Sequence, residues 1–503
     1  MSDHYAKLTR RLRETAILGS VGELAAWDQE TMMPRSAARF RAEELAVVSS
    51  LVHQKATDSA VGELIAACEA DTALIADPAI AANLGDIRRD YDRARRLPTE
   101  LVAEISKTSS LAMEAWKLAR ENNAFSDFAP WLEKQLTLQR EKAECYGRPA
   151  DGELYDALIE DYEPGMRSAE IEGLFGPLRE GLQPLIARVA SATGRIDPAL
   201  ERIPLPPARQ HAFNHTVLTQ IGFDLTAGRI DISTHPFSTG LGPGDTRITT
   251  RYRNDGFLDS LGSTMHEAGH GLYEQGLPKA ELLGQPAAEA LSLGWHESQS
   301  RLWENQVGRS RAFWTWAGPV ARGIFGDAVS KFTDEDFYRS VNIVRPNLIR
   351  VESDEATYNL HVMLRFDLER AMIRGDLTVT DLPGAWNDRI KRDLGLDVPN
   401  DTLGCLQDVH WSMGSIGYFP TYTIGNLYSA QIWDAVVTAI PSIELQMQGG
   451  DFSVLLGWLR DNIHIHGRRF TARELSARVT GYPLGSTALL RYLNTKLRPL
   501  YDL

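Results

Sequence analysis

Apolar residues recur at every third or fourth position through most of the chain, which is the spacing of one face of an α-helix. The pattern is clearest at 40–53, 101–123 and 486–500. It runs from residue 4 to about 190 and resumes after residue 258. We therefore expect helices in both regions.

Strand-like alternation is confined to the middle of the chain. Residues 223–233 and 246–254 alternate β-branched with polar residues, and the Gly/Pro-rich sequence GLGPGD lies between them. We expect these segments to form a small antiparallel pair within a mainly α-helical fold. The proline-rich stretch 193–210 marks a possible subdomain boundary inside a single domain that spans 1–503.

Composition narrows the class of protein. With 43% hydrophobic and 24% charged residues, the chain of 503 residues is typical of a soluble globular protein. A net charge of −14 disfavours nucleic acid and anionic membranes as partners. The cysteines Cys68, Cys145 and Cys405 are far apart in sequence, which fits a reducing compartment. Because no run of eighteen apolar residues and no apolar leader is present, we expect a cytoplasmic protein without membrane contact.

The segment 262–276 contains an HExxH sequence. His266 and His270 are four residues apart, so on a helix both imidazoles project from one face and can bind one zinc ion. Glu267 points about 100° around the helix, where a carboxylate can act as general base on a water at the metal. The longer HExxH form with a third histidine is excluded, because the required positions hold Tyr273 and Gly276. Small residues at 268, 269 and 271 let another element approach this helix closely.

A third metal ligand must come from elsewhere in the chain. Glu274 shares the first helix and is poorly placed to complete a tetrahedron, and Glu281 is next to a predicted loop. Glu289 and Glu297 both fall in a predicted helix over 286–306, which can run back antiparallel to the first. Glu304 is a further carboxylate in that segment. Spacing alone leaves Glu289 and Glu297 as alternatives.

Several short motifs accompany the HExxH in a fixed order along the chain. HESQ follows it at 296–299. The other segments are WDQETMMP at 27–34, HPF at 235–237, DTRIT at 245–249, IRVESD at 349–354 and GCLQDVHW at 404–411. These motifs and their order resemble those of the carboxypeptidase Taq family of metallocarboxypeptidases. One position departs from the family's IRxxAD element, with Ser353 in place of the usual alanine.

The resemblance covers nearly the whole chain and implies specific properties. It selects Glu297 as the third ligand, beside His266 and His270. It implies a saddle-shaped helical metallopeptidase fold with a long cleft crossed by the zinc helices. It also implies a homodimer, with Zn²⁺ as the cofactor and Co²⁺ as a possible substitute.

The substrate-binding residues are less clearly marked by the sequence. A guanidinium can donate two hydrogen bonds to the terminal carboxylate of a peptide, which makes Arg350 the first candidate and Arg247 the second. Candidate donors to the reacting carbonyl are His410, Tyr418 and Tyr422. We expect His235 and His296, whose spacing does not match a metal ligand, to orient other groups or to pack.

These observations predict a zinc-dependent carboxypeptidase that releases C-terminal amino acids from peptides with broad specificity. Water attacks with Glu267 as general base. Two alternatives stay open. An oligopeptidase would cleave internal bonds with the same zinc site, and a noncatalytic helical binding protein would bury the histidines without a metal.

Overall fold

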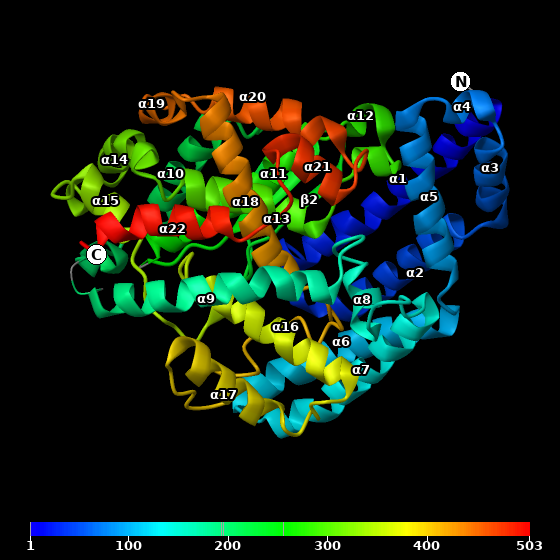
Figure 1. Ribbon diagram of the computed structural model, residues 1–503, viewed down its shortest axis with the longest axis horizontal. Coiled ribbons are helices and arrows are strands. Elements are labelled where there is room, and N and C mark those ends of the chain that lie inside the picture. The colour runs from blue at the N-terminus through cyan, green and yellow to red at the C-terminus, as the bar shows by residue number, and fades with distance from the viewer. Residues whose placement is uncertain (1, 193, 195, 255) are drawn as a thin grey trace.

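The periodic segments form a long series of α-helices around one small sheet (Figure 1). The computed structural model describes residues 2–192, 194, 196–254 and 256–503. Residues 193 and 195, at the start of the proline-rich stretch 193–210, lie outside the described residues. Within the described residues, every helix is too short or too polar to span a bilayer.

The predicted helices at 40–53, 101–123 and 486–500 are confirmed as α2, α6 and α22. The first helices are α1 (Asp3–Thr31), α2 (Ala38–Ala56), α3 (Ser59–Glu69), α4 (Thr72–Ile75), α5 (Pro78–Arg95), α6 (Thr99–Asn122), α7 (Phe125–Tyr146), α8 (Leu154–Ile159), α9 (Ser168–Ala192) and α10 (Pro207–Gln220). The next are α11 (Phe257–Gly276), α12 (Lys279–Leu282), α13 (Leu293–Arg301), α14 (Arg311–Phe325), α15 (Asp334–Ser340), α16 (Tyr358–Arg374) and α17 (Leu382–Leu394). The last are α18 (Pro420–Ala439), α19 (Ile443–Gln448), α20 (Ser453–Asn462), α21 (Ala472–Thr480) and α22 (Thr487–Leu500).

Local sequence sets many helix ends. The side chains of Asp58, Asp71 and Asp77 accept hydrogen bonds from backbone N–H groups in the first turns of α3, α4 and α5. Gly375 and Gly395 end α16 and α17 in the left-handed conformation, which a residue with a side chain rarely adopts. These caps fix where one helix ends and the next begins.

The sheet has three strands, and the antiparallel pairing expected for segments 223–233 and 246–254 was wrong. β1 (Gly228–Ile232) pairs with β3 (Asp245–Thr250) in parallel, not antiparallel. β2 (Ser238–Gly242) pairs antiparallel with β3, so the strand order is β1-β3-β2. Half of the sequence expected to form the turn, GLGPGD, belongs to β2. The turn is confined to Pro243 and Gly244. Because β2 is a third strand, the chain reverses its direction before β2 and again at this turn, so β1 and β3 run the same way.

Two clusters of buried apolar side chains stabilise the fold. The larger extends from Ala112 to Tyr501 and includes residues of α11 and α13. The smaller lies among the N-terminal helices α1, α3, α4 and α5, which Figure 1 shows on one side of the molecule. Polar contacts connect the smaller cluster with the rest of the protein. For example, the Tyr5 hydroxyl and the Asn83 amide both donate to Gln285 Oε1, at 3.1 and 2.9 Å.

Helix α13 lies between α11 and α18, and glycines allow these close contacts. A Cβ on Gly269 of α11 would lie 2.5 Å from the carbonyl oxygen of Gln299 in α13. A Cβ on Gly425 of α18 would lie 2.5 Å from Cγ of Glu297. Since neither helix leaves room for a methyl group, α13 is held at a fixed distance from its neighbours. The expectation that small residues admit a close neighbour to α11 is confirmed at Gly269.

The predicted helix over 286–306 begins later than expected. Its first residues form a 3₁₀ turn, η4 (Pro286–Ala288), and α13 starts only at Leu293, where the Ser292 side chain accepts from the Trp295 N–H. After Arg301 the helix continues as a π-helical turn, η5 (Leu302–Val307). Because Glu289 ends η4 in an extended conformation, it does not share a helix with Glu297, and that expectation was wrong.

Candidate metal centre

Three side chains from α11 and α13 converge on one point. The ligand atoms of His266, His270 and Glu297 all lie within 4.8 Å of one another. Glu297 Oε2 is 3.7 Å from His266 Nε2 and 3.4 Å from His270 Nε2. Two imidazoles and one carboxylate are a donor set that binds zinc and leaves a coordination position open for water or substrate. The residues present therefore fit a zinc ion.

The geometry decides between Glu289 and Glu297, the two alternatives for the third ligand that sequence spacing left open. Glu297 is buried at 5% exposure and faces both imidazoles. The Glu289 side chain is 57% exposed and lies 3.3 Å from Arg468 in a different part of the molecule. Glu281, on the short helix α12, is exposed as well. Of the five candidate glutamates, only Glu297 lies with His266 and His270 in the possible metal-binding group found among the described residues.

Arg301 determines which oxygen of Glu297 faces the histidines. Its Nε donates to Glu297 Oε1 at 2.6 Å, and Oε2 is left toward the imidazoles. Burial alone would raise the pKa of Glu297, but Arg301 and the imidazoles outweigh it and hold the pKa well below its ordinary value. The carboxylate is thus kept ionised, as a metal ligand must be.

A carboxylate backs one of the two histidines directly. His266 Nδ1 is 2.9 Å from Oε2 of Glu304, which lies on the π-turn η5. Arg301 and Arg309 donate to Glu304 at 3.1 and 3.3 Å. Burial would raise the pKa of Glu304, but Arg301 and His266 lower it to about 2. Although Glu304 was a candidate ligand, its carboxylate contacts the side of His266 that faces away from Glu297.

The other histidine is backed by a second imidazole. His270 Nδ1 is 2.5 Å from His296 Nδ1, and His296 Nε2 is 2.9 Å from Glu274 Oε1. Glu274 also forms an ion pair with Lys279. Burial lowers the pKa of His270 to about 3, which favours the neutral imidazole that binds metals. His296 and Glu274 therefore lie outside the group of ligands but in contact with it.

Glu267 is buried beside the ligands at 6% exposure. Burial raises its pKa to about 7, and the negative charges of Glu297 and Glu304 act in the same direction. A carboxylate with a pKa near neutrality can both accept and release a proton under ordinary conditions.

The Arg350 guanidinium lies in a buried ion-pair network. Its Nε and Nη2 donate to Asp408 Oδ1 at 3.1 and 2.8 Å, and its Nη1 donates to the Tyr358 hydroxyl at 2.8 Å. Arg365 donates to the other oxygen of Asp408 at 2.6 Å. The Arg301 guanidinium lies 4.2 Å from the centre of the Tyr358 ring, so this tyrosine connects Arg350 with the metal centre.

Three other candidate residues gather next to Arg350. His410 Nε2 is 3.2 Å from the Tyr422 hydroxyl, and the rings of Tyr418 and Tyr422 are 5.3 Å apart. The Arg350 guanidinium lies 4.9 Å from the centre of the Tyr422 ring. Burial lowers the pKa of His410 to about 3, and Arg350 adds to the effect, so its imidazole is neutral.

The remaining two candidates, Arg247 and His235, lie on the sheet and in the loop beside it, respectively. Arg247, on β3, donates to both carboxylate oxygens of Asp245 at 2.8 and 2.9 Å and lies 4.3 Å from the centre of the Trp27 ring. It therefore ties the N-terminal WDQETMMP segment to the sheet. His235 is exposed in the loop before β2.

Some residues of the site carried little or no signal in the sequence. Arg301 is four residues after Glu297, a spacing that predicts contact on a helix. Asp408 lies inside the GxxQDxHW motif, but its two arginine partners come from separate segments. Tyr358 had no sequence signal, because only the folded chain brings it between Arg301 and Arg350.

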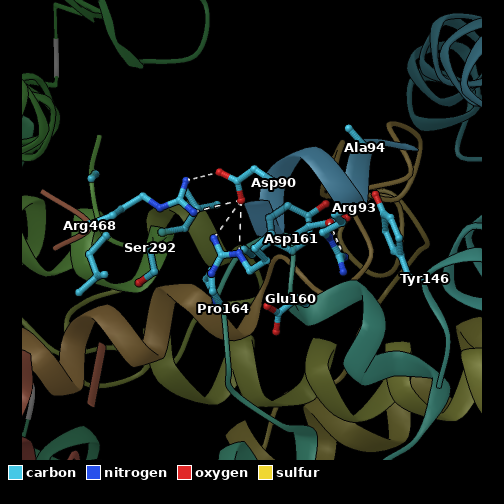
Figure 2. A pocket seen from close by; sticks show the side chains of 14 residues that line it. Asp90, Arg93, Ala94, Tyr146, Glu160, Asp161, Pro164, Ser292 and Arg468 are labelled. Atoms are coloured by element: carbon cyan, nitrogen blue, oxygen red, sulfur yellow. Dashed lines mark hydrogen bonds and ion pairs between the residues drawn. The ribbon is translucent and has the colours of Figure 1, made fainter. Parts of the chain in front are cut away.

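A separate cavity of about 390 Å³ lies between α5, the end of α7 and the segment before α13 (Figure 2). Arg468 pairs with Asp90 at 2.9 Å, and Arg93 pairs with Asp161 at 2.6 Å. The described residues that line this cavity do not include His266, His270 or Glu297, the three candidate metal ligands. The cavity is therefore distinct from the candidate metal centre, and its charges largely pair with one another.

Comparison with known proteins agrees with this geometry. Residues 7–497 match the family described as carboxypeptidase Taq (M32) metallopeptidase. Thermostable carboxypeptidase 1 of Thermus thermophilus is 44% identical, with 99% of each chain covered, and the protein of that name from Pyrococcus furiosus is 36% identical, with 97% of each covered. The crystal structure of an M32 carboxypeptidase from Deinococcus radiodurans superposes with a TM-score of 0.96 at 41% identity, covering both chains completely. The chain therefore belongs to the carboxypeptidase Taq family of metallopeptidases.

Proposed function

We propose that this metallocarboxypeptidase uses zinc, bound by His266, His270 and Glu297, to release C-terminal amino acids from peptides with broad preference. The observation that carries the proposal is the convergence of these three side chains with the buried carboxylate of Glu267. Cobalt also suits the same ligands.

The chemistry divides between the ion and the chain. When bound, zinc supplies a Lewis acid that polarises the scissile carbonyl and makes water more acidic. Glu267 accepts the proton of the attacking water on its carboxylate and then donates it to the leaving nitrogen. The hydroxyls of Tyr418 and Tyr422 are candidate donors to the oxygen of the tetrahedral intermediate, and His410 supports Tyr422.

Arg350 remains the first candidate to bind the substrate carboxylate. A guanidinium has five N–H donors, and the hydrogen bonds to Asp408 and Tyr358 use three of them. The Nη1 and Nη2 atoms each keep one N–H, which a substrate carboxylate can accept. Arg247 is the second candidate. Asp245 takes two of its N–H donors and its guanidinium lies over Trp27. Arg350, in contrast, is connected with the metal centre through Tyr358.

Mass spectrometry of a peptide digest tests the reaction. The native protein should produce a ladder of C-terminally shortened products, a chelator should abolish it, and Zn²⁺ or Co²⁺ should restore it. Glu267→Gln should lower kcat by about 10²–10⁴-fold and still bind zinc, because it removes the base but no ligand. A protein that binds no stoichiometric zinc and has the same function in the Glu267→Gln variant would contradict the proposal.

Substrates with a blocked C-terminus distinguish the carboxypeptidase from an oligopeptidase. We expect Arg350→Ala to reduce kcat/KM for free C-termini far more than any residual cleavage of blocked peptides, because only free C-termini offer a carboxylate. Arg247→Ala serves as the comparison. Equal cleavage of free and blocked peptides by the native protein would favour the oligopeptidase.

The proposal also covers assembly and location. The family resemblance supports a homodimer, which light scattering of the purified protein tests. The acidic charge and the three dispersed cysteines support a cytoplasmic location without nucleic-acid partners.

A further inference from the structure

We propose that His296 is a positioning residue that, together with Glu274, forms a hydrogen-bonded relay behind the metal ligand His270. The inference rests on the proposed metal site. It gives a role to the histidine of the HESQ segment, which supplies no ligand to the group of His266, His270 and Glu297.

With a metal ion bound at His270 Nε2, only one arrangement of protons fits the distances. His270 Nε2 lies 3.4 Å from Glu297 Oε2, so this nitrogen faces the metal position and must offer a lone pair. A neutral imidazole then carries its hydrogen on Nδ1. His270 Nδ1 therefore donates to His296 Nδ1, 2.5 Å away, which must be the acceptor.

The same argument continues one residue further. Since His296 accepts at Nδ1, its own hydrogen is on Nε2, which donates to Glu274 Oε1 at 2.9 Å. Glu274 is held by its ion pair with Lys279, and the His296 ring lies 5.5 Å from the ring of Tyr273. Each group in the relay is thus fixed by the next, and the carboxylate at its end is anchored.

The two metal histidines are supported in different ways. His266 donates directly to the carboxylate of Glu304, 2.9 Å away. The buried Nδ1–H of His270 is satisfied by His296, and the negative charge of Glu274 acts through that ring. Outer partners of this kind fix the orientation and basicity of a ligand, and their loss typically lowers metal affinity by about 10–100-fold.

Metal titrations on the full-length protein test the relay. His296→Leu removes the acceptor, and we expect the Kd for Zn²⁺, measured by chelator competition, to rise by about 10–100-fold. His296→Asn can place an amide oxygen near the same position, so its Kd should lie between those of the native protein and the leucine variant. The visible absorption bands of the Co²⁺-loaded protein should shift in the leucine variant, because the orientation of His270 changes.

Two further variants complete the test. Glu274→Gln keeps an acceptor for His296 but removes the charge, so we expect a smaller rise in Kd than in His296→Leu. His464→Leu is the matched control. This buried histidine contacts the same two helices, through Gln299 at 3.0 Å and the Tyr273 ring at 5.0 Å, but its contacts do not include a metal-binding residue.

The outcomes separate this inference from the proposed function. If the native protein binds no stoichiometric Zn²⁺, the proposed function fails and the relay fails with it. If the native protein binds Zn²⁺ but His296→Leu and His464→Leu change the Kd equally, or if Co²⁺ spectra stay unchanged, the relay alone is overturned. Should His296→Leu fail to fold, an unchanged Kd in Glu274→Gln would also overturn it.

Discussion

Glu163 shows how burial makes one side chain sensitive to pH. It is 1% exposed and accepts hydrogen bonds from the Ser292 hydroxyl at 2.8 Å and from the Gly294 N–H at 2.9 Å, at the start of α13. Burial raises its pKa from 4.5 to about 7, more than these hydrogen bonds lower it. The folded state therefore holds a proton here between about pH 4.5 and 7, and stability is lost as the pH rises through this window.

Glu163→Gln should remove that dependence, because an amide resembles the protonated acid and does not titrate. Relative to the native protein, the free energy of unfolding of the variant should rise by about 3 kcal/mol between pH 4.5 and 8. Urea unfolding of the metal-free proteins across this range measures the difference. Glu133→Gln, at an exposed position, controls for the loss of a charge. A difference between Glu163→Gln and the native protein that does not vary with pH would contradict the prediction.

The candidate metal ligands show which residues of the site the sequence could predict and which it could not. The spacing of His266 and His270 predicted two ligands, because four residues along a helix place both side chains on one face. The same reasoning could not choose between Glu289 and Glu297, since the choice depends on where α13 begins. Ser292 caps that helix with its side chain, which leaves Glu289 outside it. The family resemblance selected Glu297, and the structure brings it to the histidines.

At the scale of elements, α11 offers a matched pair of glycines. A Cβ on Gly269 would lie 2.5 Å from a main-chain oxygen of α13, which cannot rotate away, whereas a Cβ on Gly262 would meet nothing within 4 Å. We expect Gly269→Ala to cost about 1–3 kcal/mol of stability and to weaken Zn²⁺ binding by displacing Glu297. Gly262→Ala should stabilise α11 by up to about 1 kcal/mol.

Thermal unfolding and Zn²⁺ titration of the two variants check this contrast. Equal behaviour of Gly269→Ala and Gly262→Ala in both measurements would show that the spacing between α11 and α13 does not control the metal centre.

Hydrophobic periodicity predicted helices better than it predicted strands. Helices such as α2, α6 and α22 follow from local spacing alone, because their hydrogen bonds are internal. Strand pairing depends on segments distant in sequence, and the glycines of β2 hid a strand inside an expected turn. The parallel pairing of β1 with β3 could not be read from either segment by itself.

For the whole molecule, the two apolar clusters predict that the N-terminal helices open at a lower free energy than the larger core unfolds. The N-terminal cluster contacts the rest of the protein through polar groups, including the buried Asn83, which donates to Tyr5 and Gln285 and accepts from the Ala287 N–H. A cluster joined in this way can open while the larger core stays folded. The residues of this cluster are Tyr5, Leu8, Val61, Ile65, Cys68, Leu74, Leu84, Ile87 and Tyr91.

Asn83→Ala should favour this opening, because it leaves the Ala287 N–H without its side-chain acceptor and removes two hydrogen bonds from the junction. We expect the free energy of opening to fall by about 1–3 kcal/mol. Amide hydrogen exchange should then become faster in α3, α4 and α5, with α16 and α18 unchanged. Asn462→Ala, which removes a hydrogen bond to Trp458 within α20, is the control. Faster exchange in α16 as well would mean that the two clusters unfold together, so that the metal centre would lose its ligand geometry whenever the N-terminal helices open.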